Sequence, residues 1–170
     1  MTIDLIPAMG VRLPGPLPEL VFGMSEPHAR RVLAPHAALS EAFVCGTDWA
    51  VDFDLPGCSI ALSASDRGGL SIISLSRRPV DERAACPVAF QGVDVFGWPA
   101  AEIIEALHEQ GEPVQEHHSG TVWIGNVRLS PTLGHRPTAS TRKKPRTAPP
   151  YVFDFVCLYE PGMLSRDRQR

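Results

Sequence analysis

The side chains of this sequence that could do chemistry are four cysteines, six histidines and a group of carboxylates. Cys45 is the best candidate for a nucleophile, because an imidazole from His117 or His118 would lower the pKa of its thiol. No nucleophile motif surrounds Cys45, and nothing in the sequence brings those histidines to it. The sequence therefore assigns no catalytic residue.

The spacing of these residues argues against a metal site and against a cofactor site. Adjacent histidines on a strand point to opposite faces, and neither an H-x-x-x-H nor a C-x-x-C pair occurs. The segments FGMSE and FGWPA each hold one glycine and no phosphate-binding lysine, which argues against a nucleotide. We expect no metal, no cofactor, solvated histidines and mostly buried thiols. The histidines and cysteines concerned are His28, His36, His108, His117, His118, His135, Cys45, Cys58, Cys86 and Cys157.

Three aspartates, Asp48, Asp52 and Asp54, lie in or next to a predicted strand. In WAVDFDLP apolar residues alternate with others, which predicts a strand over residues 49–56 with two carboxylates about 7 Å apart on one face. General acid–base catalysis would need their pKa values to be pushed apart, and the sequence gives no sign of that. We interpret the three carboxylates as an acidic face for a basic protein partner.

The matching segment of the second half, WIGNVRLSP, predicts another strand over residues 123–131. On it we expect Trp123, Val127 and Leu129 to face the core. Asn126 and Arg128 then face outward and join the predicted partner-binding surface.

Charge is divided unevenly along the chain. Residues 1–137 hold 9 arginines and 16 acidic residues, a net of 9 − 16 = −7, whereas residues 138–150 hold four basic residues and no acidic one. The negative net charge of residues 1–137 disfavours binding to nucleic acid. No aromatic residue lies among the basic residues of 138–150 to stack on bases. We predict a loop that contacts a partner through Arg142, Lys143, Lys144 and Arg146.

One stretch occurs twice, as VFGMSEPHARRVL and as VFGWPAAEIIEAL. Aligned without gaps, residues 21–55 and 95–129 share 8 of 35 positions, including Trp49 with Trp123. Typical residue frequencies would give about two identities. A duplicated unit is the economical explanation.

Each copy is predicted to begin with a helix and to continue with strands. Pro27 and Pro99 suit first helical turns. The first copy continues with a hairpin of two strands over 58–65 and 70–76. The second copy continues with a strand over 151–161, which is apolar on both faces and is therefore predicted to lie in the middle of a sheet.

These patterns predict an α+β fold: two tandem helix-plus-antiparallel-sheet repeats forming one compact unit, with the helices on one sheet face. The other face is left for recognition. The expected divisions are 1–20 as an N-terminal hairpin or edge, 21–78 as the first repeat, 79–94 as a connection, 95–164 as the second repeat with a basic loop at 131–150, and 165–170 as a frayed tail.

Composition, at 44% hydrophobic and 21% charged residues, fits a folded protein rather than a membrane-spanning one. No apolar run approaches the roughly 18 residues of a membrane-spanning helix. The first ten residues, MTIDLIPAMG, lack the features of a signal peptide. We expect no membrane segment and a cytoplasmic location.

The helix entry Phe22-Gly23-Met24-Ser25, followed by a small sheet and repeated at Phe96-Gly97-Trp98-Pro99, resembles the tandem-repeat β-lactamase inhibitor protein family. It is also similar to small helix-plus-sheet modules that include an outer-membrane assembly lipoprotein. The resemblance covers about 120 residues and implies a concave sheet that grips another protein. It carries over no contact residue, and this chain differs in its lack of a signal peptide and of a persuasive disulfide arrangement.

Two classes of function follow. The first is a non-enzymatic protein-binding protein, namely an intracellular inhibitor or immunity-type protein that occludes a toxin or enzyme. The alternative is a small enzyme or metabolite-binding protein that uses a cleft between the repeats, lined by Trp98, His117, His118 and Cys45. A deep pocket with convergent polar groups would favour the alternative, and a continuous sheet face would favour the first. Nucleic-acid binding through residues 142–146 is a third and weaker hypothesis.

Overall fold

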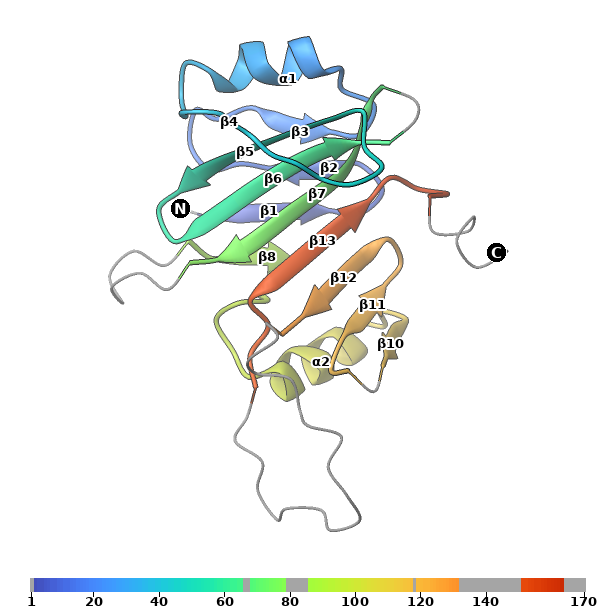
Figure 1. Ribbon diagram of the computed structural model, residues 1–170. Coiled ribbons are helices and arrows are strands. Elements are labelled where there is room, and N and C mark those ends of the chain that lie inside the picture. The colour runs from blue at the N-terminus through green and yellow to red at the C-terminus, as the bar shows by residue number, and fades with distance from the viewer. Residues whose placement is uncertain (1, 66–67, 79–85, 118, 132–150, 164–170) are drawn as a thin grey trace.

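The computed structural model describes residues 2–65, 68–78, 86–117, 119–131 and 151–163. They form two β-sheets around one hydrophobic core, with a short helix at each end of the molecule (Figure 1). The larger sheet has the order β10 (Val114–Glu116), β11 (Val122–Ile124), β12 (Val127–Ser130), β13 (Phe155–Tyr159), β7 (Leu70–Arg77), β6 (Cys58–Ala64), β5 (Trp49–Leu55) and β4 (Ser40–Glu41). The smaller has the order β3 (Glu19–Val21), β2 (Gly10–Arg12), β1 (Ile3–Ile6), β8 (Val88–Phe90) and β9 (Val93–Asp94).

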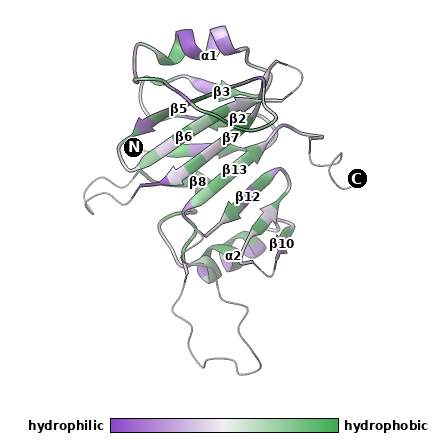
Figure 2. Ribbon diagram, in the orientation of Figure 1, coloured by the Kyte–Doolittle hydropathy of each residue, from purple (hydrophilic) through white to green (hydrophobic). Residues whose placement is uncertain are grey.

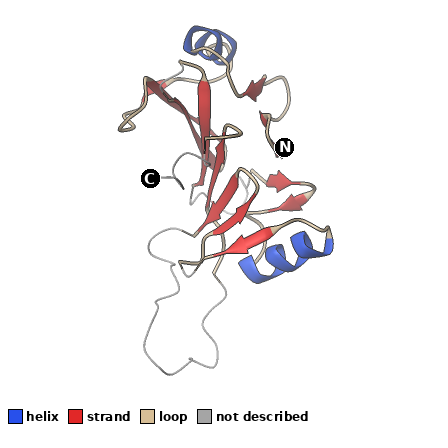
Figure 3. Cartoon of the chain, turned by 90° about the vertical axis from the view of Figure 1, so that its right-hand side faces the viewer, coloured by secondary structure: helices blue, strands red, loops and turns tan. Residues whose placement is uncertain are grey.

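The expected α+β fold with helices on one sheet face is wrong. The helices α1 (Glu26–Leu33) and α2 (Ala100–Glu109) have only 8 and 10 residues, so they cannot cover an eight-stranded sheet. The smaller sheet supplies the second layer, as the edge-on view in Figure 3 shows. Its strands come from segments that the sequence indicated only as an N-terminal hairpin or edge and as a connection. The protein is therefore mostly β.

The smaller sheet was missed because its central pairing is non-local. β1 runs parallel to β8, with Ile3 opposite Val88, and no local pattern signals a partner so distant in the chain. The β1–β2 hairpin itself matches the prediction, with Leu5 opposite Val11. However, β1 lies in the middle of its sheet rather than at an edge.

The strands of the larger sheet follow the apolar patterns of the sequence. β5, the β6–β7 hairpin and the central position of β13 confirm the predictions made for those segments. One face of each strand enters the core, where Val51, Leu62 and Leu75 are fully buried. Figure 2 shows the hydrophobic character of β12 and β13, the middle of this layer.

Strand order is mirrored about the centre of the molecule. From the β7–β13 pair outward, the larger sheet reads β6, β5, β4 on one side and β12, β11, β10 on the other. β2–β3 and β8–β9 likewise flank β1. Isolated bridges occur at both helix entries, from Ser25 to Gly69 and from Pro99 to Val152, and Ser25 and Pro99 are 74 residues apart, as are the two VFG motifs. This order is what a duplicated unit would produce, and the duplication and its division points stay a prediction.

The two tryptophans are not counterparts in this arrangement. Trp49 pairs with Ala64 and is 8% exposed in the core, whereas Trp123 pairs with Arg128 on the opposite face of the sheet. The prediction that Trp123 faces the core is therefore wrong. Segment 123–131 is two strands joined at Gly125 and Asn126, and the reversal changes which residues share a face.

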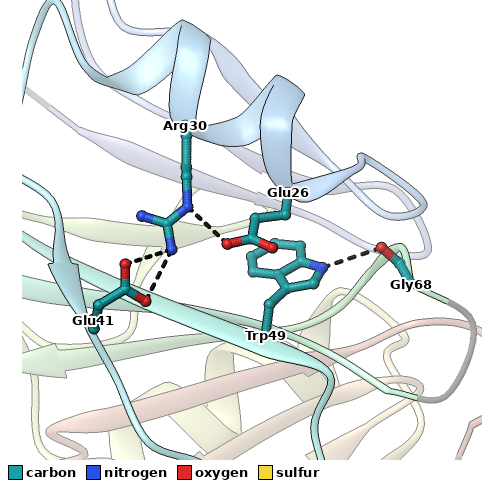
Figure 4. A network of polar contacts seen from close by, with 5 residues as sticks. All are labelled: Glu26, Arg30, Glu41, Trp49 and Gly68. Atoms are coloured by element: carbon teal, nitrogen blue, oxygen red, sulfur yellow. Dashed lines mark hydrogen bonds and ion pairs between the residues drawn. The ribbon is translucent and has the colours of Figure 1, made fainter.

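Polar contacts hold α1 and Trp49 in place (Figure 4). Arg30 of α1 forms ion pairs of 2.8 Å with Glu26 in its own helix and with Glu41 of β4. The indole Nε1 of Trp49 donates a hydrogen bond of 3.1 Å to the carbonyl oxygen of Gly68. These side chains have their partners within the fold, so they serve structure.

Candidate functional site

The larger sheet has one face in the core and one face turned away from it. Register decides which residues lie where: Val156 and Leu75 pair on the inner face, whereas Cys157 and Ser74 pair on the outer one. We call the outer face the open face. Its side chains change in character across the sheet, from aspartates on β5, through serines on β6 and β7, to aromatic residues and an arginine on β11 to β13.

Four side chains of the open face form a group that we call the Arg128 cluster: Trp123, Arg128, Phe155 and Tyr159. The guanidinium carbon lies 5.8 Å from the ring centroid of Trp123, 5.6 Å from Phe155 and 5.9 Å from Tyr159. Trp123 and Tyr159 also contact each other, with ring centroids 5.5 Å apart and planes tilted by 30°. At these distances each ring face attracts the cation.

Strand register produces this cluster. Arg128 on β12 lies opposite Trp123 on one side and opposite Cys157 on the other. Phe155 and Tyr159, each two positions from Cys157, therefore flank the arginine diagonally, within reach of a long side chain. All four cluster residues are only half-buried, so the group is reachable from solvent.

Asn126, predicted to bind a partner, forms two hydrogen bonds within the fold. It occupies the β11–β12 turn, where Gly125 takes a φ of 57°. Its side-chain amide donates to the carbonyl oxygen of Tyr159 at 2.6 Å, and its Oδ1 accepts from the backbone N–H of Ala8 at 3.2 Å. Both ends of the amide are thus engaged within the chain.

Of the three aspartates predicted to form an acidic face, only two lie in the strand β5. Asp52 and Asp54 project from the open face of β5, opposite Ala61 and Ser59. Asp54 forms an exposed ion pair of 2.6 Å with Arg78, whereas Asp48 precedes the strand and is exposed. Four strand spacings separate β5 from β12, which is roughly 19 Å. The remaining predicted contact residues lie outside the described residues: Arg142, Lys143, Lys144 and Arg146. Segments 79–85, 132–150 and 164–170 also lie outside them.

The residues weighed for catalysis are not brought together. Cys45 is exposed in the loop before β5, and His117 is exposed in the loop after β10. These loops lie at opposite ends of the larger sheet, roughly 30 Å apart by strand spacing. Burial raises the pKa of the Cys58 thiol to about 12, so this cysteine is protonated at neutral pH and unsuited to act as a nucleophile.

A pocket of about 320 Å³ lies beside α2 and β9 rather than between the two halves. Asp94, Trp98 and Glu102 line it, and of the lining predicted for an inter-repeat cleft it contains only Trp98. His118 lies outside the described residues. Within the described ranges, no group of three or more histidine, cysteine or acidic side chains is arranged to hold a metal ion.

Comparison with protein-family models, with curated proteins and with solved structures found no match to this chain. The resemblance to the β-lactamase inhibitor protein family therefore stays a prediction. In the described part of the chain, neither helix has the length and apolar character needed to cross a membrane.

Sequence reasoning found Arg128 but missed the three rings around it. Two signals point to them. The dipeptide Gly125-Asn126 between apolar residues is typical of a tight hairpin, which would have placed Trp123 beside Arg128 on the open face. The segment 151–161 is apolar on both faces, and its second face carries Phe155 and Tyr159.

Proposed function

We propose that this chain is a non-enzymatic protein-binding protein and that its binding surface is the open face of the larger sheet. The Arg128 cluster is the observation that carries the proposal. Tryptophan, tyrosine and arginine are the residues most enriched among those that dominate binding energy at protein interfaces. Here they lie together on a sheet face, and each of them is partly exposed to solvent.

The size and chemistry of the open face support this use. Eight strands span seven spacings, roughly 34 Å, and a mean strand length of about 16 Å gives an area on the order of 550 Å². That approaches the about 800 Å² that each partner contributes to a standard interface. Ser59, Ser74 and Ser76 are small and lie between the aspartates and the rings, so they leave both ends of the face accessible.

The narrower proposal is an inhibitor or immunity-type protein that occludes a toxin or enzyme in the cytoplasm. It is supported by the predicted duplication and by the resemblance to the inhibitor family, in which a sheet surface grips another protein. Asp52 would then contact a basic group of the partner, in keeping with the acidic face expected from the sequence.

The test compares binding by cluster variants with binding by a matched control. Proteins encoded beside this one in the genome are mixed with it, and the affinity of any complex is measured by titration calorimetry at low and high salt. Trp123→Ala should weaken a specific complex at least thirtyfold, which is about 2 kcal/mol. Trp98→Ala removes an equally large but more exposed ring, 57% exposed beside α2, and should leave affinity unchanged.

The opposite pattern would exclude the open face as the binding surface. A complex that is insensitive to Trp123→Ala and is lost in Trp98→Ala would instead favour the pocket beside α2. Circular dichroism of both variants establishes that each remains folded.

A further inference from the structure

Arginines elsewhere in the described chain have partners within the fold. Three of them form ion pairs with carboxylates, one contacts a histidine ring, and one donates to a backbone carbonyl. These pairs are Arg12 with Glu19, Arg30 with Glu26 and Glu41, Arg78 with Asp54, Arg31 with His28, and Arg77 with Phe96.

Arg128 differs from all of these. Its Nε is buried from solvent and has no hydrogen-bond partner among the described residues. Its cross-strand neighbours are Trp123 and Cys157, and Phe155 and Tyr159 flank it, so three ring faces attract the cation but give its Nε no hydrogen bond. A buried donor that is left without an acceptor costs free energy, so an acceptor supplied on binding would contribute strongly.

The structural setting also restricts what that acceptor is. A guanidinium is planar and carries five N–H donors in a fork that matches the two oxygens of a carboxylate. In a complex, the rings and the partner together would exclude water from the contact, which strengthens a charge-assisted hydrogen bond. The rings also offer apolar area to the residues beside the carboxylate.

A phosphate of a nucleic acid would present a similar oxygen geometry, but the rest of the face opposes it. Asp52 and Asp54 lie on the same open face, and the chain carries a net charge of −3. A polyanion extending across the sheet would meet these carboxylates, whereas a protein surface can carry groups of both signs.

We infer that the partner places an aspartate or glutamate side chain, flanked by apolar residues, against the guanidinium of Arg128. This inference rests on the proposed function, because it names the group that the open face recognises. The carboxylate accepts two hydrogen bonds from the guanidinium and sits among the three rings. Arg128 is then the specificity-determining residue of the surface.

A random peptide library displayed on phage tests this inference, because the selection itself identifies the sequences that the open face binds. The library is selected on the immobilised full chain, and each selected peptide is then tested for binding to the variant Arg128→Met, which keeps an unbranched, mostly apolar side chain and removes its donors. Selected peptides should be enriched in Asp or Glu beside aromatic or aliphatic residues. Replacing that acidic residue by Asn or Gln should weaken each peptide about tenfold, and Arg128→Lys should recover only part of the affinity because lysine lacks the fork.

Arg31→Met is the matched control, because Arg31 is exposed on α1, away from the open face, and its loss should leave peptide affinity unchanged. Peptides that require Trp123 and Tyr159 but lack an acidic residue would overturn this inference and leave the proposed function standing. If the selected peptides ignore the whole cluster, or if none is enriched, both would be wrong. Arg128-dependent binding of a twelve-nucleotide oligo-dT in place of acidic peptides would also overturn it, in favour of nucleic acid.

Discussion

The substitution Arg128→Met separates a binding role for the cluster from a structural one. It removes three contacts between the guanidinium and the rings of Trp123, Phe155 and Tyr159, each worth about 0.5–1 kcal/mol at a partly exposed site. It also removes the buried Nε donor that has no acceptor, which costs the folded state about 1–3 kcal/mol. The two effects oppose each other and nearly cancel. We expect the free energy of unfolding to change by no more than about 1 kcal/mol.

Urea unfolding followed by tryptophan fluorescence and circular dichroism measures this change. For a chain of this size, 1 kcal/mol corresponds to about 2–4 °C in Tm. Binding of a partner or of a selected acidic peptide should fall at least tenfold in the same variant. Stability nearly unchanged and affinity reduced is the expected combination.

A different result would refute the reasoning. If Arg128→Met lowers the free energy of unfolding by about 3 kcal/mol or more, the guanidinium holds the rings in place and the cluster is part of the fold. Retained affinity alongside that loss would establish a structural role alone.

Three further predictions concern the fold that presents this surface. Because burial raises the Cys58 pKa from 9.0 to about 12, the folded state favours the protonated thiol, and this contribution to stability is lost as pH rises. Between pH 7 and pH 10 the free energy of unfolding should therefore fall by about 1 kcal/mol more in the wild type than in Cys58→Ala, whereas equal slopes would contradict the raised pKa. Gly10→Ala places a Cβ 1.9 Å from a carbonyl oxygen of β3 at a φ of 141°, so urea unfolding should show a loss of about 3 kcal/mol in the free energy of unfolding. Gly15→Ala, where nothing lies within 4 Å of the added Cβ, should lose only about 1 kcal/mol. Similar losses in the two variants would argue against the β2–β3 pairing. Phe153→Ala removes a fully buried ring and should lower the free energy of unfolding in urea by about 3–5 kcal/mol. Phe43→Ser removes a ring that is 90% exposed and should change it by less than about 0.5 kcal/mol; a large loss there would mean that the ring is covered.

Local patterns of the sequence were sufficient to predict several elements. Alternation of apolar residues predicted β5 and the β6–β7 hairpin, and proline near each helix start predicted α1 and α2. These predictions succeeded because period and turn chemistry are properties of a few neighbouring residues. The composition of 151–161 also predicted a central strand, since a strand apolar on both faces requires neighbours on both sides.

Layering and sheet pairing were predicted wrongly or not at all. The helices were assigned to a sheet face that the smaller sheet covers, and the parallel pairing of β1 with β8 has no local signal. A single overlooked turn at Gly125 placed Trp123 on the wrong face, because side chains alternate along a strand and a chain reversal changes which residues share a face.

The sequence by itself determined that this chain alternates short strands with two short helices and that Arg128 faces away from the core. Only the tertiary structure decided what surrounds that arginine. Phe155 and Tyr159 are separated from it by the segment 132–150 and reach it through one register, with Arg128 opposite Cys157. A shift of one residue would turn both rings toward the core, so the cluster exists because the packing of the two sheets fixes that register.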